Sequence, residues 1–117
     1  MFWSKNENEI DGNTLKDWLD GKNDIHLIDV RSTAEVAQGM IQGAKNVPLH
    51  TLPLRLEDLP QDKKIVIYCS SGNRSTMAYN YLKQNMRDHD QYDIYHLRRG
   101  LFEWYGAGQS VVRSKAA

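Results

Sequence analysis

The fold of this chain is decided by IVIYCSSGNRS, which spans residues 65–75. Residues 65–68 are apolar and mostly β-branched, which predicts a central strand buried on both faces of a parallel sheet. Residues 75–86 carry apolar side chains at helical spacing. The strand would therefore deliver Cys69 to a short loop that opens a helix, at the sheet edge where such sheets bind ligands.

Strand and helix signals alternate through the rest of the 117 residues. The expected strands are 25–30, 65–68, 92–97 and a very short one within 43–48. The expected helices are 14–20 capped by Asn13, a short one capped by Ser32 with Glu35 completing a capping box, the leucine-rich 49–59, 75–86 and 102–105. This alternation with short connections predicts one α/β domain whose mainly parallel sheet is covered by helices on both faces.

Three sets of apolar side chains are expected to form the core around this sheet. The first helix would bury Leu15, Trp18 and Leu19, and the last would bury Phe102 and Trp104. The helix at 75–86 would bury the stripe formed by Met77, Ala78, Tyr81, Leu82 and Met86.

Composition excludes several classes of function. Lys plus Arg equals Asp plus Glu at 15 each, so no charge signature for nucleic acid stands out. No apolar run approaches the roughly 20 residues of a membrane span, and the N-terminus does not resemble a secretory signal. The one cysteine cannot form an internal disulfide, and no histidine pair has metal-ligand spacing. We therefore expect a cytoplasmic protein that needs no metal or other cofactor and has no nucleic-acid or membrane partner.

The chemistry is expected at Cys69. A loop between a strand and a helix can point several backbone N–H groups at one spot, where the helix dipole favours negative charge. Arg74 would add a positive charge, and such surroundings favour the thiolate. We predict Cys69 as the catalytic nucleophile, within an anion-binding loop formed by Ser70, Ser71, Gly72, Asn73, Arg74 and Ser75.

Three separated stretches resemble the rhodanese family of single-domain sulfurtransferases. They are 28–48, where IDVR is followed by Glu35 and GMIQGAKNVP; 68–75, YCSSGNRS; and 97–104, LRRGLFEW. Their order and spacing follow the family over residues 9–112, so 1–117 is expected to be a single rhodanese-like domain with three layers and a sheet of four or five strands. Three departures from the family pattern are Met40 where the family usually has His, Arg99-Gly100 where it usually has paired Gly, and a slightly long stretch between Leu82 and Tyr92 that lacks the usual glycine.

The resemblance implies that Cys69 takes a sulfane sulfur from a small anionic donor, with thiosulfate favoured, and carries it as a persulfide. A thiol, cyanide or a protein thiol would accept it. Asp29 and Arg31 are expected to brace the loop from a neighbouring strand, and Arg99 either places a cation over the site or narrows its entrance.

Three alternatives stay open at this point. A cysteine-dependent phosphatase or arsenate reductase also uses a thiolate in an anion-binding loop, but the pattern of those enzymes is Cys-x5-Arg. The loop here has four residues between Cys69 and Arg74 and is one residue shorter. A non-catalytic protein-interaction module is the second alternative. A persulfide relay, which hands sulfur to a protein thiol, is the third.

Overall fold

A five-stranded parallel sheet is the centre of the computed structural model, which describes residues 8–21 and 24–113. The strand order is β1-β5-β4-β2-β3, and every pairing is parallel. The strands are β1 (Glu9–Ile10), β2 (Ile25–Asp29), β3 (Lys45–Asn46), β4 (Lys64–Tyr68) and β5 (Asp93–Leu97). The predicted α/β class and the central place of the strand at 65–68 are both confirmed.

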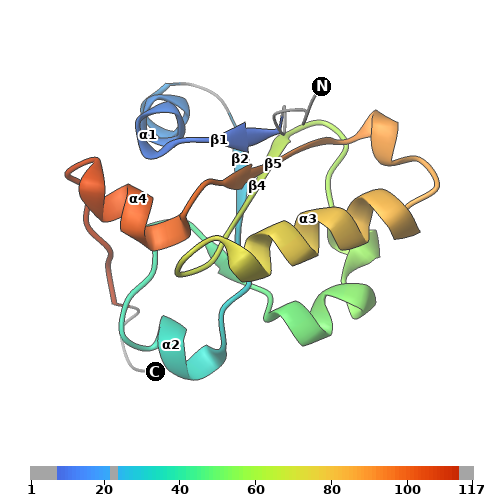
Figure 1. The fold of residues 1–117 in the computed structure, drawn as a ribbon. Coiled ribbons are helices and arrows are strands. Elements are labelled where there is room, and N and C mark those ends of the chain that lie inside the picture. The colour runs from blue at the N-terminus through green and yellow to red at the C-terminus, as the bar shows by residue number, and fades with distance from the viewer. Residues whose placement is uncertain (1–7, 22–23, 114–117) are drawn as a thin grey trace, which may run out of the picture.

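Helices cover both faces of the sheet, as Figure 1 shows. One face carries α1 (Gly12–Asp20) and α4 (Gly100–Gly106), which contact each other. The other carries α3 (Asn73–Asn85) and the 3₁₀ helices η1 (Leu49–Leu54) and η2 (Leu56–Asp58). The short α2 (Thr33–Val36) lies beyond the carboxyl end of β2, and the 3₁₀ turn η3 (His89–Gln91) leads into β5.

Alternate residues of β4 supply the two halves of the core. Ile65 and Ile67 pack against α3 and η1, whereas Val66 and Tyr68 pack against α1 and α4. All four are fully buried. Complete burial of one such aliphatic side chain contributes about 1.5–3 kcal/mol to the free energy of folding, so this strand anchors the loop that follows it.

Two helix predictions were wrong in detail. Asp11, and not Asn13, caps α1, because its carboxylate accepts from the Thr14 amide at 2.8 Å. The leucine-rich stretch forms two 3₁₀ helices and no α-helix, since Pro53 has no N–H to donate within a helical ladder. The capping box between Ser32 and Glu35 is confirmed.

Some core predictions were also wrong. Phe102 and Met77 have 67% and 59% of their surface exposed, whereas Tyr79 is buried on the inner face of α3. Leu15 and Trp104 are buried as expected. Strand β1 was not predicted, because two residues are too few to show a period.

None of the helices within the described ranges is both long and apolar enough to cross a membrane.

Candidate active site

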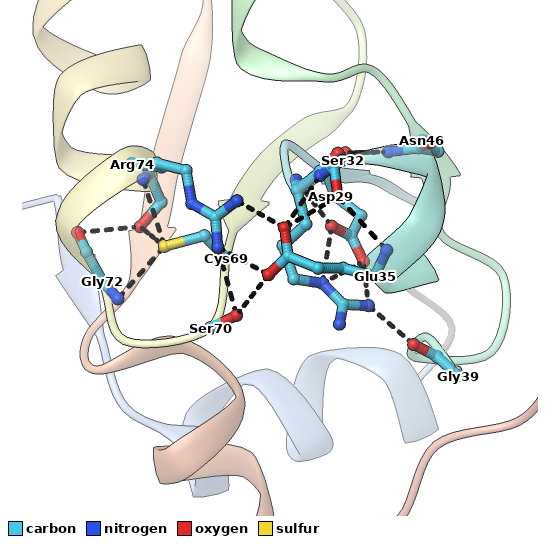
Figure 2. A network of polar contacts seen from close by, with 11 residues as sticks. Asp29, Ser32, Glu35, Gly39, Asn46, Cys69, Ser70, Gly72 and Arg74 are labelled. Atoms are coloured by element: carbon cyan, nitrogen blue, oxygen red, sulfur yellow. Dashed lines mark hydrogen bonds and ion pairs between the residues drawn. The ribbon is translucent and has the colours of Figure 1, made fainter. Parts of the chain in front are cut away.

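Cys69 is the residue directly after β4, and it opens the Cys69 loop, residues 69–75. Gly72 turns the chain with φ 101°, a left-handed conformation that glycine adopts without a side-chain penalty. That turn points the Gly72 amide at the Cys69 Sγ, 3.1 Å away (Figure 2). The Ser75 amide donates to the same sulfur at 3.4 Å. Two main-chain dipoles therefore converge on the sulfur and favour negative charge there.

The Ser75 hydroxyl is also hydrogen-bonded to the sulfur. The Cys69 thiol donates to Ser75 Oγ across 3.7 Å, and that hydroxyl donates to the Gly72 carbonyl at 3.2 Å. When the thiol loses its proton, the Ser75 hydroxyl can turn and donate to the sulfur instead. Ser75 is buried at the start of α3, so it can serve the sulfur without competition from bulk water.

The start of α4 holds the Cys69 loop from behind. The Leu101 amide donates to the Cys69 carbonyl at 2.9 Å, and the Phe102 amide donates to the Ser70 carbonyl at 3.3 Å. Gly100 allows this approach, because a Cβ there would lie 2.2 Å from the Cys69 carbonyl oxygen. Amides at the start of α4 thus find their hydrogen-bond acceptors in the loop, and the carbonyls of Cys69 and Ser70 are satisfied by them.

Arg74 points along the surface of the loop to a carboxylate on α2. Its guanidinium donates to Glu35 through two parallel hydrogen bonds, of 2.6 Å to Oε1 and 2.8 Å to Oε2. Ser70 Oγ accepts from Arg74 and donates to Glu35, both at 3.2 Å. The hydrogen bonds from Arg74 hold the pKa of Glu35 well below its usual range, and those same bonds raise the pKa of Arg74.

A second ion pair, between Arg31 and Asp29, is buried. Arg31 donates to both oxygens of Asp29 at 2.7–3.1 Å and also to the Gly39 carbonyl at 2.6 Å. The Asn46 amide joins this cluster by donating to the carbonyls of Asp29 and Arg31. Burial disfavours the charged guanidinium, but the Asp29 carboxylate outweighs it and raises the pKa of Arg31.

Comparison with known proteins places the chain in a family. The model of the rhodanese-like domain matches residues 11–107. This chain is a member of the rhodanese family. A sulfurtransferase of Allochromatium vinosum is 40% identical over 105 residues, which cover 90% of this chain and 94% of that protein. The putative sulfurtransferase YtwF of Bacillus subtilis is 34% identical over 98 residues, covering 84% of this chain and 90% of that protein.

Solved structures agree with this assignment. The rhodanese-related protein of Thermoplasma volcanium superimposes with a TM-score of 0.78 at 27% identity, covering 92% of this chain and 99% of that one. A rhodanese-like domain protein of Staphylococcus aureus gives the same TM-score and coverage at 26% identity. The relatives and the fold together support sulfur transfer as the general chemistry of this rhodanese and place it among the transferases.

The predicted site residues considered so far fall into four groups in this rhodanese. Gly72 and Ser75 contact the sulfur directly, while Ser70 and Arg74 turn toward Glu35. Ser71 and Asn73 are exposed where the loop turns. Asp29 and Arg31 pair with each other and fix the segment that includes Gly39, so they support the site from a distance.

Arg99, which stands where the resemblance led us to expect glycine, has a backbone conformation that favours glycine. Its φ is 59°, the one positive φ among the described residues other than glycine. A Cβ on Gly72 would lie 3.0 Å from the Arg99 amide nitrogen, so the two loops are in close contact through their backbones. The Arg99 side chain is exposed and forms no ion pair within residues 8–21 and 24–113.

Glu35 is the site residue that sequence reasoning placed only in a helix cap. Its second role depends on Arg74, which lies 39 positions later in the chain. The sequence feature that could have indicated this role is Arg74, because a half-buried arginine needs a carboxylate partner. The family motif supplies such a carboxylate, Glu35, before Gly39.

Proposed function

We propose that this rhodanese moves a sulfane sulfur from a small anionic donor, thiosulfate, to a thiophilic acceptor through a persulfide on Cys69. The observation that carries the proposal is the convergence of the Gly72 and Ser75 amides on the Cys69 sulfur, at 3.1 and 3.4 Å. The same donors that stabilise a thiolate can stabilise the terminal sulfur of a persulfide, which also carries negative charge.

The transfer needs no external oxidant or reductant. The Cys69 thiolate attacks the outer sulfur of thiosulfate, a new S–S bond forms, and the old S–S bond breaks with its electron pair leaving on sulfite. The acceptor thiolate or cyanide then attacks the terminal sulfur of the persulfide and regenerates the Cys69 thiolate. Sulfite leaves as a stable anion, so no general acid is required.

The carboxylate nearest the loop argues against phosphatase chemistry. Release of an alkoxide from a phosphate ester is helped by a protonated carboxylic acid at the leaving group. The hydrogen bonds from Arg74 lower the pKa of Glu35 well below its usual range, so at neutral pH this carboxylate is ionised and has no proton to donate. The short loop and the ionised carboxylate both favour sulfur transfer.

The burial of Cys69 restricts which acceptors can reach its sulfur. Only 1% of its surface is exposed, so an acceptor must reach the sulfur end-on. Cyanide and a small thiol satisfy this requirement, and so does a cysteine on an extended segment of a partner protein. The proposal therefore includes a persulfide relay as one use of the same site.

Intact-mass spectrometry tests the proposal. Incubation with thiosulfate should add about 32 Da, the mass of one persulfide sulfur, and Cys69→Ser should not gain it. Subsequent addition of cyanide, glutathione or a reduced protein thiol should remove the added mass, and the relative rates would rank the acceptors. No mass gain from thiosulfate would refute the proposed donor, and rapid hydrolysis of an aryl phosphate without sulfur uptake would favour the phosphatase alternative.

A further inference from the structure

Glu35 connects α2 to the Cys69 loop through hydrogen bonds. Within α2 it accepts from the Ser32 amide at 3.1 Å, which completes the capping box. Toward the Cys69 loop it accepts both hydrogen bonds of the Arg74 fork and one from Ser70 (Figure 2). A carboxylate of α2 is therefore fixed beside the loop that carries the nucleophile.

The pair places two opposite charges beside the loop that carries the sulfur. Arg74 donates a hydrogen bond to Ser70, the residue next to Cys69. The carboxylate of Glu35 lies within hydrogen-bond distance of the same guanidinium and the same hydroxyl. The net charge of the pair is zero, so the attraction that Arg74 would exert on an anion is largely offset by repulsion from Glu35.

We infer that Glu35 is a specificity-determining residue, which neutralises Arg74 and so limits the affinity of the Cys69 loop for doubly charged donors. The inference rests on the proposed function, because it concerns the donor of that reaction. In this arrangement the loop amides contribute most of the binding free energy of the donor. The net charge of the Glu35–Arg74 pair then sets how strongly the affinity depends on the charge of the donor. Binding should then follow the net charge of residues 35 and 74 and should not depend on the integrity of the ion pair.

The competing explanation is that the pair is only a strut that holds the loop. The two explanations separate in a set of four chains, all carrying Cys69→Ser so that no sulfur can be transferred. Glu35→Gln is a suitable change, because glutamine at this position still completes the capping box with Ser32 and still accepts a hydrogen bond from Arg74. Arg74→Met removes the cation while keeping much of the aliphatic stem.

Thiosulfate binding to these four chains, measured by titration calorimetry at low ionic strength, tests the inference. The expected order of affinity is Glu35→Gln first, then the parent and the double variant Glu35→Gln/Arg74→Met together, then Arg74→Met. Each unit of net charge should change the dissociation constant by about three- to tenfold, and added salt should compress the series. The strut explanation predicts instead that Glu35→Gln binds no better than the parent and that both chains carrying Arg74→Met bind more weakly than the parent.

Each outcome decides the question. A Glu35→Gln chain that binds thiosulfate no better than the parent overturns the inference, as does the absence of measurable binding by every chain. Urea unfolding of the same chains reports whether a weaker binder has lost its fold, and the double variant gives a second test, because it should bind better than Arg74→Met alone. A wild-type chain that gains no sulfur, while the four chains follow the charge order, would refute the proposed sulfur transfer and leave the effect of Glu35 on anion binding standing.

Discussion

The Asp29–Arg31 pair and the Glu35–Arg74 pair both lie near the carboxyl end of the sheet, and their surroundings differ. The side chains of Asp29 and Arg31 are 0% and 6% exposed, and they are joined to the Gly39 carbonyl. The side chains of Glu35 and Arg74 are 35% and 34% exposed, and they join α2 to the Cys69 loop. Burial makes the first pair a structural requirement, whereas exposure makes the second a means of adjusting charge at the site.

The largest expected difference between the pairs is in stability. Arg31→Met would leave the Asp29 carboxylate buried without a cation and should lower the free energy of unfolding by about 3–5 kcal/mol. Arg74→Met is the matched control, and it should cost about 1 kcal/mol or less because Glu35 can be solvated. Urea unfolding at neutral pH measures both values, and equal losses would contradict the contrast between the pairs.

Removal of both charges from the buried pair sharpens the comparison. The double variant Asp29→Asn/Arg31→Met should recover a large part of the stability lost in Arg31→Met, because no unpaired charge remains in the interior. The same urea experiment gives the coupling between the two positions. A double variant as unstable as Arg31→Met would show that packing of the arginine stem, and not its charge, dominates.

The contribution of the exposed Glu35–Arg74 pair to stability should depend on pH. The folded-state pKa of Glu35 is lowered by Arg74, so its contribution to stability is fully present above the unfolded value near 4.5. It should be lost as pH falls from 4.5 toward the lower folded-state pKa. The difference in free energy of unfolding between the parent and Glu35→Gln should therefore be below about 1 kcal/mol at pH 7 and smaller still at pH 3. A difference that grows on acidification would contradict the lowered pKa.

The smallest expected effect on stability comes from substitution of Arg99, and here the free energy of unfolding should rise. Its left-handed backbone suits glycine better than arginine, so Arg99→Gly should raise the free energy of unfolding by up to about 1 kcal/mol. Arg99→Lys keeps the charge and the strain, which makes it the matched control. Thermal unfolding of the two variants would show the difference, and destabilisation by Arg99→Gly would mean that the arginine side chain makes contacts of its own.

Features that depend on residues close together in the sequence could be predicted, whereas features that depend on distant residues could not. The strand before Cys69 could be predicted because four consecutive apolar residues suffice to indicate it, and the capping box could be predicted because its partners are three residues apart. Phe102 was misplaced because a seven-residue helix offers too few turns to define which side faces the sheet. The role of Glu35 at the loop was missed because its partner, Arg74, is 39 positions away.

The sequence alone determined that a strand, a glycine-containing loop and a helix follow one another around Cys69, and therefore that main-chain amides could face a thiol. These features depend on neighbours in the chain, whose spacing can be read directly. Only the tertiary structure decided where the loop arginine points, because α2 and α3 must first pack beside the sheet before Glu35 can reach Arg74. The charge that the sulfur experiences is thus set by contacts between segments that folding brings together.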